Sequence, residues 1–227
     1  MTQIAERLAR VRARIRTAEE RFHRPPGSVH LLAVSKTKPV DAIRAAMAAG
    51  QMAFGENYVQ DAREKQELLA SSDAEWHFIG PLQSNKTKLV ASHFDWVHSV
   101  EREKIARRLS EQRPEALSPL NVCLQVNASG ETSKSGLQPQ ALPALSDAVA
   151  TLPGLRLRGL MCIPAPCDDP ELQREPFRRL RELKEELEQR GFPLDTLSMG
   201  MSADLEAAIA EGSTLVRVGS DIFGPRD

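Results

Sequence analysis

A lysine at the end of an apolar segment is the residue best suited to covalent chemistry in this chain of 227 residues. Lys36 closes the run Leu-Leu-Ala-Val-Ser-Lys, which is typical of a buried strand. Burial disfavours the charged form of an amine, and a neutral amine can attack a carbonyl carbon. Lys38 lies just beyond it and would favour the neutral form in the same way. The alternative is a solvated lysine in the loop before Pro39.

Two segments near the C-terminus could bind a phosphate group. Ser202 follows Leu-Ser-Met-Gly-Met and is expected to be the N-cap of a helix that starts at Ala203, whose first N–H groups are free for an anion. Gly219 and Ser220 combine a backbone that a ligand can approach closely with a hydroxyl group. Taken singly, the two segments are equally well explained as an ordinary cap and an ordinary turn.

Arg217 stands between the two valines of Leu-Val-Arg-Val-Gly. In a strand covered on both faces it points either inward, with a partner, or outward between helices. An inward arginine could meet the ring nitrogen of a bound cofactor. Because arginine keeps its proton, it would donate to that nitrogen, leave it unprotonated and so weaken the cofactor as an electron sink.

Short apolar segments alternate along the chain with longer amphipathic ones, and their centres lie about 26 residues apart. The apolar segments predict strands over residues 30–36, 52–57, 76–82, 95–100, 121–127, 155–163, 196–202 and 215–223. Helices are predicted between them over residues 40–49, 57–70, 86–92, 101–112, 140–151, 176–190 and 203–211. Such alternation, with no block of strands alone, indicates a parallel sheet.

Eight strands are the number that closes a TIM-type (β/α)8 barrel, so we expect an α/β barrel as a single domain over residues 1–227. Apolar residues at helical spacing between Ile4 and Phe22 predict an extra N-terminal helix. An open doubly wound sheet is the rival fold, but no G-x-G-x-x-G follows a predicted strand. In a barrel the strand ends share one rim, where the loops after strands 7 and 8 often bind phosphate, so Lys36 is expected to face both phosphate segments.

The composition argues against several kinds of partner. Thirty basic and 31 acidic residues give a net charge of −1, which attracts neither nucleic acid nor an anionic membrane. No apolar run approaches the ~20 residues of a membrane span. The three cysteines match no metal motif and no signal peptide is evident, so we expect reduced thiols in a cytoplasmic protein. The five histidines lack metal-binding spacings, and no apolar stripe is left for a second subunit, so we expect no metal and a monomer.

Several segments are similar to those of the YggS/PROSC family of pyridoxal phosphate homeostasis proteins. They are Ala-Val-Ser-Lys-Thr-Lys-Pro (33–39), Phe-Gly-Glu-Asn-Tyr-Val-Gln (54–60), Trp-His-Phe-Ile-Gly-Pro-Leu-Gln-Ser-Asn-Lys (76–86), Ser-Lys-Ser-Gly (133–136), Arg-Gly-Leu-Met (158–161), Leu-Ser-Met-Gly-Met-Ser (197–202) and Val-Arg-Val-Gly-Ser-Asp-Ile-Phe-Gly (216–224). The similarity runs nearly end to end and implies a fold like the N-terminal barrel of alanine racemase.

The resemblance also implies a cofactor and its ligands. Pyridoxal 5′-phosphate (PLP) would form a Schiff base with Lys36. The other expected contacts are Ser202, Gly219 and Ser220 with the phosphate, Arg217 with the pyridine nitrogen, and Asn57 and Met199 with the ring. The family pattern commonly has threonine at the position of Ser220, but both residues carry a hydroxyl group. Proteins of this family bind and pass on PLP, maintain vitamin B6 homeostasis and affect amino-acid and keto-acid balance, with no established enzymatic activity.

Three functions remain open on this reading. The first is a PLP carrier that delivers the cofactor to apo-PLP-enzymes. The second is an amino-acid racemase, which needs an acid–base group on each face of the carbanion. Alanine racemase takes the second group from a tyrosine of a further domain, which we expect to be absent here, and Tyr58 is the single tyrosine. The third is an aldolase in which Lys36 attacks the substrate directly. The roles of Lys38 and Lys134, two further amines, stay open.

Overall fold

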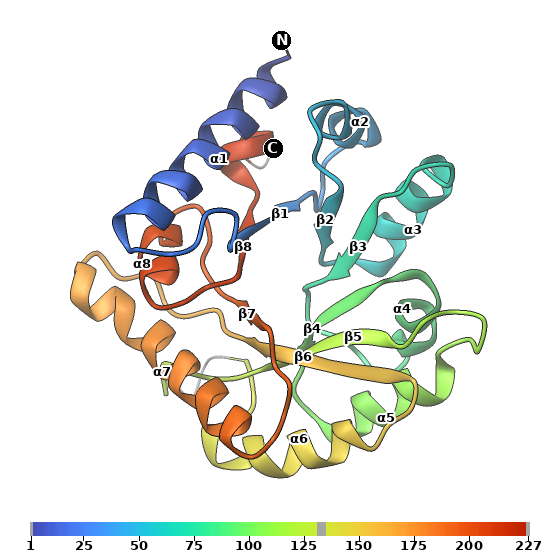
Figure 1. Cartoon of the computed structure of the whole chain (residues 1–227). Helices are drawn as coiled ribbons and strands as arrows, with labels where there is room; N and C mark the ends of the chain where they lie inside the picture. The colour runs from blue at the N-terminus through green and yellow to red at the C-terminus, as the bar shows by residue number, and fades with distance from the viewer. Residues whose placement is uncertain (1, 131–134, 226–227) are drawn as a thin grey trace.

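The computed structural model describes residues 2–130 and 135–225. Within these residues, eight parallel strands pair in chain order, and β8 pairs with β1 to close a barrel (Figure 1). The strands are β1 (His30–Val34), β2 (Ala53–Glu56), β3 (Glu75–Phe78), β4 (Trp96–Val100), β5 (Leu120–Gln125), β6 (Leu155–Met161), β7 (Thr196–Ser198) and β8 (Leu215–Val218). The prediction of a TIM-type (β/α)8 barrel is confirmed.

Most strands end earlier than the sequence predicts. β1 stops at Val34 and β8 at Val218, so Lys36 lies in the loop past its strand rather than inside it. The second half of the predicted eighth strand is wrong, because Ser220–Phe223 forms the short helix α9. A continuous apolar run does not distinguish a strand from a buried helical turn, and Ile222 of this segment is fully buried.

Helices cover the outside of the barrel between the strands (Figure 1). They are α1 (Gln3–Arg21), α2 (Val40–Ala48), α3 (Val59–Leu68), α4 (Thr87–His93), α5 (Glu103–Gln112), α6 (Leu142–Ala150), α7 (Pro170–Gln189), α8 (Leu205–Ala210) and α9. The predicted start of α7 at Pro176 is wrong. The helix begins at Pro170 because Asp169 accepts the N–H groups of Glu171 and Leu172 at 2.9 and 3.1 Å, a side-chain cap that fixes the first turn upstream.

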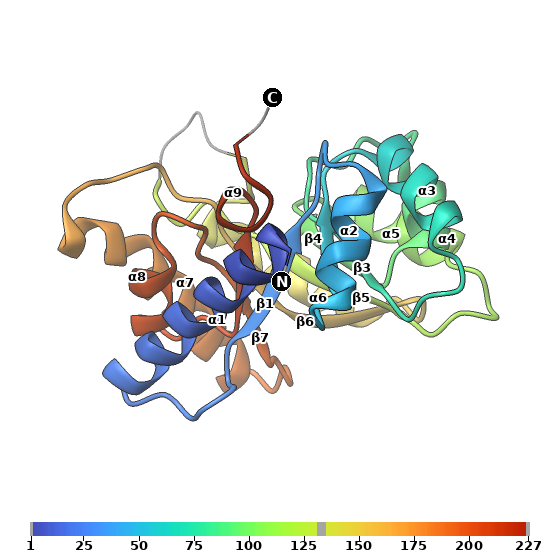
Figure 2. The ribbon, with the colours of Figure 1, turned by 90° about the horizontal axis from the view of Figure 1, so that it is seen from above.

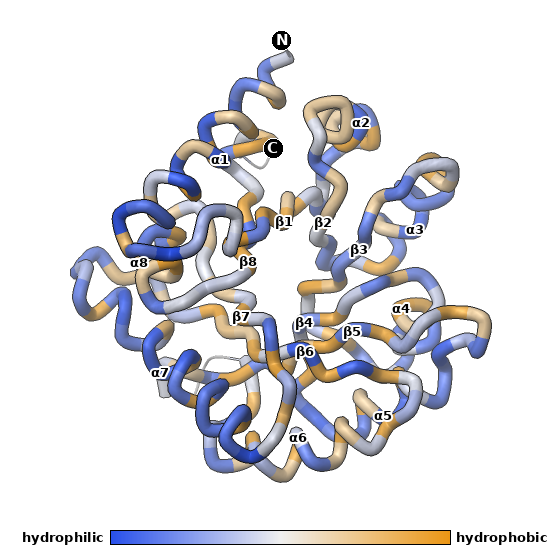
Figure 3. The backbone as a smooth tube through the Cα atoms, viewed as in Figure 1, coloured by the Kyte–Doolittle hydropathy of each residue, from blue (hydrophilic) through white to orange (hydrophobic). Residues whose placement is uncertain are grey.

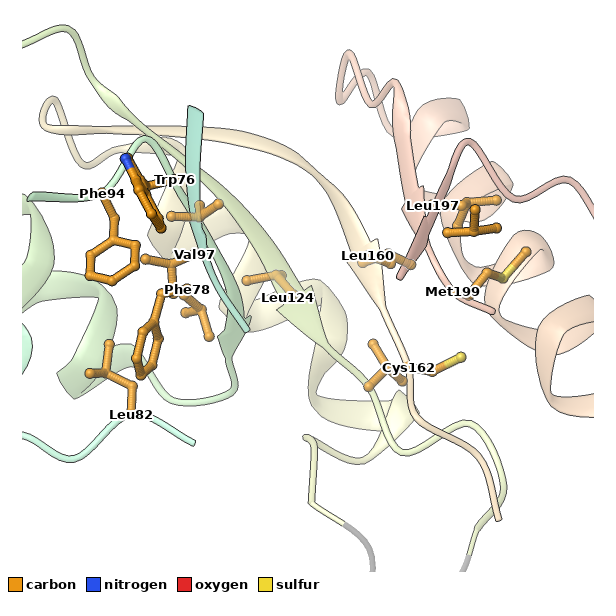
Figure 4. Packing of buried hydrophobic residues seen from close by; sticks show 14 of the residues in the cluster. Trp76, Phe78, Leu82, Phe94, Val97, Leu124, Leu160, Cys162, Leu197 and Met199 are labelled. Atoms are coloured by element: carbon orange, nitrogen blue, oxygen red, sulfur yellow. The ribbon is translucent and has the colours of Figure 1, made fainter. Parts of the chain in front are cut away.

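The hydrophobic core fills the layer between the strands and the helices. Figure 3 shows hydrophilic and hydrophobic residues alternating along the helices, as expected when one helix face packs on the barrel. In the close view of Figure 4, Phe78 and Phe94 pack edge to face with their ring centroids 5.4 Å apart. Leu197 and Met199 lie among the buried residues at the other side of that view.

The predicted N-terminal helix is confirmed as α1. It buries Leu8, Val11 and Ile15 and lies outside the barrel beside α8 and α9 (Figures 1 and 2). Because α8 and α9 follow the loops after β7 and β8, α1 supports from outside the two loops in which phosphate contacts are expected. Among the described residues, no helix has both the length and the apolar composition that crossing a bilayer requires.

Phe177 offers a test of how much the barrel depends on α7. Its side chain is fully buried, and we expect Phe177→Ala to lower the free energy of unfolding by about 3–5 kcal/mol because it removes apolar contacts and leaves a cavity. Leu172→Ala is the control on the same helix, since Leu172 is 58% exposed and its loss should cost less than about 0.5 kcal/mol. Urea unfolding followed by circular dichroism measures both; equal stabilities for the two variants would contradict the packing of α7.

Candidate functional site

A cavity of about 290 Å³ opens at the carboxyl end of the barrel. Its walls come from the loops that follow β1, β2, β3, β6, β7 and β8. Lys38 lines it, together with six of the residues expected to contact PLP: Lys36, Asn57, Ser202, Arg217, Gly219 and Ser220. Larger hollows, of about 560 and 610 Å³, lie against α7 and at the amino end of the strands, but these six residues line neither.

Lys36 is half-buried and sits in a tight turn. The N–H of Lys38 donates to the carbonyl of Ser35 at 3.0 Å and closes that turn around Lys36. Thr37 has a φ of +63°, a conformation that costs a β-branched residue of order 1–3 kcal/mol. The turn therefore needs support from outside. Part of it comes from Lys38, whose Nζ donates to the carbonyl of Pro225 at 2.6 Å.

A buried group of ionisable residues supplies the rest of that support. The Nζ of Lys65 donates to the carbonyl of Ser35 at 2.9 Å, to Glu56 Oε1 at 2.8 Å and to Asp61 Oδ2 at 2.8 Å. Ser35 donates its hydroxyl to the same Glu56 oxygen, and Asp61 accepts the N–H of Thr37. The residues on both sides of Lys36 are thus fixed by one network. Burial raises the pKa of Glu56, and the charge of Lys65 opposes that shift.

This network was not predicted from the sequence. Its signals were a buried-strand glutamate, Glu56, and the i,i+4 pair Asp61 and Lys65 on the helix that follows. An exposed helix pair has the same spacing, so only the burial of Lys65, which is 4% exposed, distinguishes the two cases.

In the loops after β7 and β8, two hydroxyl groups of the cavity wall face each other. Ser202 Oγ and Ser220 Oγ lie 3.3 Å apart, after β7 and β8. Next to them, a Cβ on Gly219 would lie 3.2 Å from the carbonyl oxygen of Val34, so glycine lets the end of β8 approach the end of β1. Arg14 of α1 ties this side to the outer helix, because it donates to the carbonyl of Ser202 at 3.0 Å.

The predicted N-cap role of Ser202 is wrong. α8 starts at Leu205, with Asp204 at the cap position. Asp204 Oδ1 instead accepts the N–H of Met201 at 2.5 Å and stabilises a turn between β7 and α8. Ser202 lies in that turn with its hydroxyl directed to Ser220, so its side chain is not used to satisfy the helix.

Asn57 follows β2 and has an unusual amide. Its Oδ1 is buried and has no hydrogen-bond partner within the described part of the chain. Buried polar atoms are nearly always paired, so an unpaired one at a cavity indicates a position where a ligand or water would bind. Gly80 holds the segment in place, because any Cβ there would lie 2.5 Å from the carbonyl oxygen of Asn57.

Arg217 points into the barrel, the inward option of the two considered from the sequence. Its Nη1 donates to the carbonyl and hydroxyl oxygens of Ser198 at 2.5 and 2.8 Å, and its Nη2 to the carbonyl of Cys162 at 2.8 Å. Burial lowers its pKa from the ordinary arginine value. These bonds use three of the five N–H donors and hold the guanidinium at the floor of the cavity.

Two other residues considered from the sequence do not line the cavity. Met199 is fully buried in the core (Figure 4) and does not line the cavity, whereas Met201 does. Tyr58 is 58% exposed and does not line it either. Lys134 lies outside the described residues. No group of three or more metal-ligating side chains occurs within residues 2–130 and 135–225.

Removal of Lys65 tests the buried network. Lys65→Met leaves the Glu56 carboxyl group buried without its counter-ion, and we expect a loss of about 3–5 kcal/mol in the free energy of unfolding. Lys88→Met, which removes an exposed lysine, should change it by less than about 0.5 kcal/mol. The double variant Glu56→Gln/Lys65→Met should recover part of the loss, since no buried charge remains. Urea unfolding checks all three, and a Lys65→Met protein as stable as Lys88→Met would contradict the assignment.

His98, whose Nδ1 lies 2.7 Å from Ser198 Oγ, predicts a pH dependence of stability. Burial, with the charges of His77 and Arg217, holds the pKa of His98 well below its usual value. The unfolded chain gains a proton below about pH 6.5 that the folded chain does not bind, so stability should fall with acidification by up to about 1.4 kcal/mol per pH unit. His98→Gln should remove that slope and His93→Gln, at an exposed site, should keep it. Thermal unfolding between about pH 5 and 8 distinguishes them.

The chain was compared with known proteins. Residues 7–227 match the family model for the alanine racemase N-terminal domain. A pyridoxal phosphate homeostasis protein of Pseudomonas aeruginosa is 61% identical over 227 residues, which cover 100% of this chain and 97% of the relative. The homeostasis protein of Escherichia coli K12 is 55% identical over 231 residues, with coverages of 100% and 98%.

Solved structures of related proteins have the same fold as this chain. PipY of Synechococcus elongatus with PLP bound superposes with a TM-score of 0.86 at 40% identity, covering 98% of this chain and 100% of PipY. Alanine racemase of Corynebacterium glutamicum, at 16% identity and a TM-score of 0.71, covers 98% of this chain with 60% of its own and shares the fold alone. The sequence similarity, the family model and the PipY superposition together place the chain in the YggS/PROSC family of pyridoxal phosphate homeostasis proteins.

Proposed function

We propose that this protein binds PLP at the carboxyl end of its barrel and carries or buffers it, and so maintains vitamin B6 homeostasis with effects on amino-acid and keto-acid balance. One observation carries the proposal. An amine, a pair of hydroxyl groups and a guanidinium group, contributed by Lys36, Ser202, Ser220 and Arg217, line a single cavity of about 290 Å³. These are the groups needed to hold an aldehyde, a phosphate and a ring nitrogen. The structure of the relative PipY with PLP bound supports the choice of ligand.

The residues present fit PLP. Lys36 would bind the aldehyde carbon, and the hydroxyls of Ser202 and Ser220, with the backbone at Gly219, would bind the phosphate. The unpaired Oδ1 of Asn57 offers a further polar contact beside the ring. Bound PLP supplies an electron sink whose strength depends on the protonation of its ring nitrogen.

Arg217 would set the state of that nitrogen. Because a guanidinium only donates, it would leave the ring nitrogen unprotonated, which favours holding the cofactor over activating a substrate. Met199 was expected beside the ring, but it is buried in the core, so Met201 is the methionine that we place at the cofactor.

A weak amino-acid racemase is the second candidate. Racemisation needs two acid–base groups on opposite faces of the substrate. Lys36 could be one, but Tyr58 is exposed outside the cavity, and Lys38 is engaged with the carbonyl of Pro225. The geometry therefore favours the carrier.

The remaining attributes of the protein are proposals too. We propose a cytoplasmic monomer that folds as one domain over residues 1–227 and passes PLP to apo-PLP-enzymes. The three cysteines are free, which is usual for a reducing compartment.

Covalent attachment is tested with the Lys36→Ala variant. Wild-type protein incubated with PLP should gain a visible absorption band, and after borohydride reduction the added mass should lie on the peptide that contains Lys36. Lys36→Ala should lose both signals, because Lys38, the other lysine that lines the cavity, is engaged with the carbonyl of Pro225. Lys88→Ala, at an exposed site, should retain both. A band of wild-type intensity in Lys36→Ala, or label mainly on another lysine, would overturn the assignment.

The carrier is separated from an enzyme by two measurements on the loaded protein. Incubated in D2O with each amino acid, it should show no exchange of the α-proton by NMR, whereas prompt exchange would favour the racemase. Mixed with an apo-PLP-enzyme, it should restore activity, and a rate above that of an equal concentration of free PLP would indicate direct delivery.

A further inference from the structure

A chain of hydrogen-bonded side chains runs through the barrel interior from the cavity to the amino end of the strands. Arg217 Nη1 donates to Ser198 Oγ at 2.8 Å, and Ser198 Oγ lies 2.7 Å from His98 Nδ1. His98 Nε2 lies 2.9 Å from His77 Nδ1, and His77 Nε2 lies 2.6 Å from Glu75 Oε1. β4 and β7 are not neighbours in the sheet, so the bond between His98 and Ser198 must cross the interior.

The Glu75 end of this chain is the one that is broadly exposed to water. His98 and Ser198 are fully buried and His77 is 1% exposed, whereas the side chain of Glu75 is 50% exposed. Glu75 and His77 line the hollow of about 610 Å³ at the amino end of the strands. The other end is Arg217, at the floor of the candidate PLP cavity. Proton exchange with solvent is therefore expected at the Glu75 end.

The chemistry of the two end groups fixes the direction of every bond. Arg217 can only donate and an ionised Glu75 can only accept. When His77 is neutral, its Nε2–H donates to Glu75 and its Nδ1 accepts the Nε2–H of His98. His98, which then has no other proton, accepts the hydroxyl proton of Ser198 at Nδ1. All the donors in this state point from the cavity toward Glu75.

One added proton reverses the middle of the chain. A His77 that carries protons on both nitrogens donates from Nδ1 to His98 Nε2. A neutral His98 must then hold its proton on Nδ1 and donate it to Ser198 Oγ. The Ser198 oxygen now accepts from both His98 and Arg217, and its own hydroxyl proton must turn elsewhere. The two states differ by a single proton taken up from solvent.

The surroundings of the two histidines disfavour a doubly protonated His98. Burial, with the charges of His77 and Arg217, lowers the pKa of His98. The hydrogen bond from His77 lowers the pKa of Glu75, which keeps the acceptor ionised. From β6, Arg158 lies over the face of Trp96, 4.6 Å from its ring centroid, and Asp195 pairs with Arg158 at 2.7 Å. Trp96 in turn stacks on His77, so this ion pair completes the charged surroundings of the histidine.

We propose that His77 is a proton-linked positioning residue for Arg217: uptake of one proton at His77 switches the tautomer of His98 and reverses the hydrogen bond between His98 and Ser198. The Ser198 hydroxyl oxygen, which holds the guanidinium, then accepts a second hydrogen bond. The switch itself needs no ligand. Its consequence for a bound cofactor rests on the proposed function, because there Arg217 contacts the ring nitrogen and a pH change at the far end of the barrel alters that contact.

The switch is tested on the full-length protein without PLP. Two-dimensional ¹⁵N NMR of histidine-labelled protein reports which ring nitrogen carries a proton at each of the five histidines. As the pH is lowered, we expect the Nδ1–H tautomer of His98 to appear together with double protonation of His77, and the Nε2–H tautomer to occur only with a neutral His77. A His98 that keeps one tautomer throughout, or that itself becomes doubly protonated first, would overturn the proposal.

Two variants and a control separate the switch from ordinary packing. His77→Gln cannot titrate, so the tautomer of His98 should no longer change with pH. Ser198→Ala should leave the His98 switch in place but disconnect it from Arg217. His93→Gln removes an exposed histidine outside the chain and should behave as wild type. A pH-dependent tautomer change that persists in His77→Gln contradicts the proposal, even if Ser198→Ala behaves as expected.

Loaded protein tests the link to the cofactor. The visible band of bound PLP should shift with pH at the midpoint found for His77, and the shift should vanish in His77→Gln and Ser198→Ala but not in His93→Gln. If PLP does not bind, the proposed function fails while the NMR result still decides the switch. If PLP binds but its visible band does not shift at the midpoint measured for His77, the proposed coupling between His77 and Arg217 is wrong.

Discussion

Pairing of β1 with β8 is the constraint on which the rest of the structure depends. Their register sets Leu32 beside Arg217 and Ala33 beside Val218, so the first and last strands end at the same height. Lys36 and Ser220 are distant in sequence. Because their strands pair, the amine of one and the hydroxyl group of the other line the same cavity. Gly219 makes the approach possible, because a side chain there would press on the backbone of Val34. The helices α1 and α9 then cover this junction from outside.

Residues at strand ends could be predicted from the sequence, because the position of a strand end in a parallel barrel is fixed by the topology alone. On this basis Lys36, Ser202, Gly219 and Ser220 were expected together at the carboxyl end of the barrel. Met199, which the family resemblance implied, is buried in the core, and Met201, two positions further on and past the end of β7 at Ser198, is the methionine that lines the cavity. Boundaries of short strands are set by tertiary contacts, which a local pattern does not contain.

Contacts across the barrel interior could not be predicted from the sequence, for a different reason. The bond between His98 and Ser198 joins strands that are neither consecutive nor adjacent, and the two residues are separated by 100 positions. The hydrogen bond from Lys65 to Ser35 crosses from α3 to the loop after β1, 30 positions earlier in the chain. Periodicity reports which face of an element is apolar, and each of these polar residues occurs on a face that is otherwise apolar. Burial of single polar side chains is the information that the sequence pattern lacked.

The polar interior has an energetic cost that must be offset by its own hydrogen bonds. Interiors of such barrels are usually filled by branched aliphatic side chains, whereas this one holds Arg217, Ser198, His98 and His77. A buried guanidinium is tolerated because two strand-end carbonyls and a hydroxyl accept its protons. The same bonds orient it before any ligand arrives, so no side-chain entropy is lost at that contact on binding.

The two ends of the cavity differ in a way that suits a carrier. Arg217 at the floor is 4% exposed and rigidly held, while Ser220 on the opposite side is exposed and Ile163 at the mouth is 42% exposed. An enzyme that stabilises a carbanion gains from excluding water around the reacting atoms. A protein that must release its ligand gains from access of water instead. Solvent can then reach the phosphate of the ligand while the protein still holds its ring. On the proposed assignment of the phosphate to Ser202 and Ser220, the fixed, donor-only floor would serve retention of PLP and the exposed hydroxyl of Ser220 would serve its exchange.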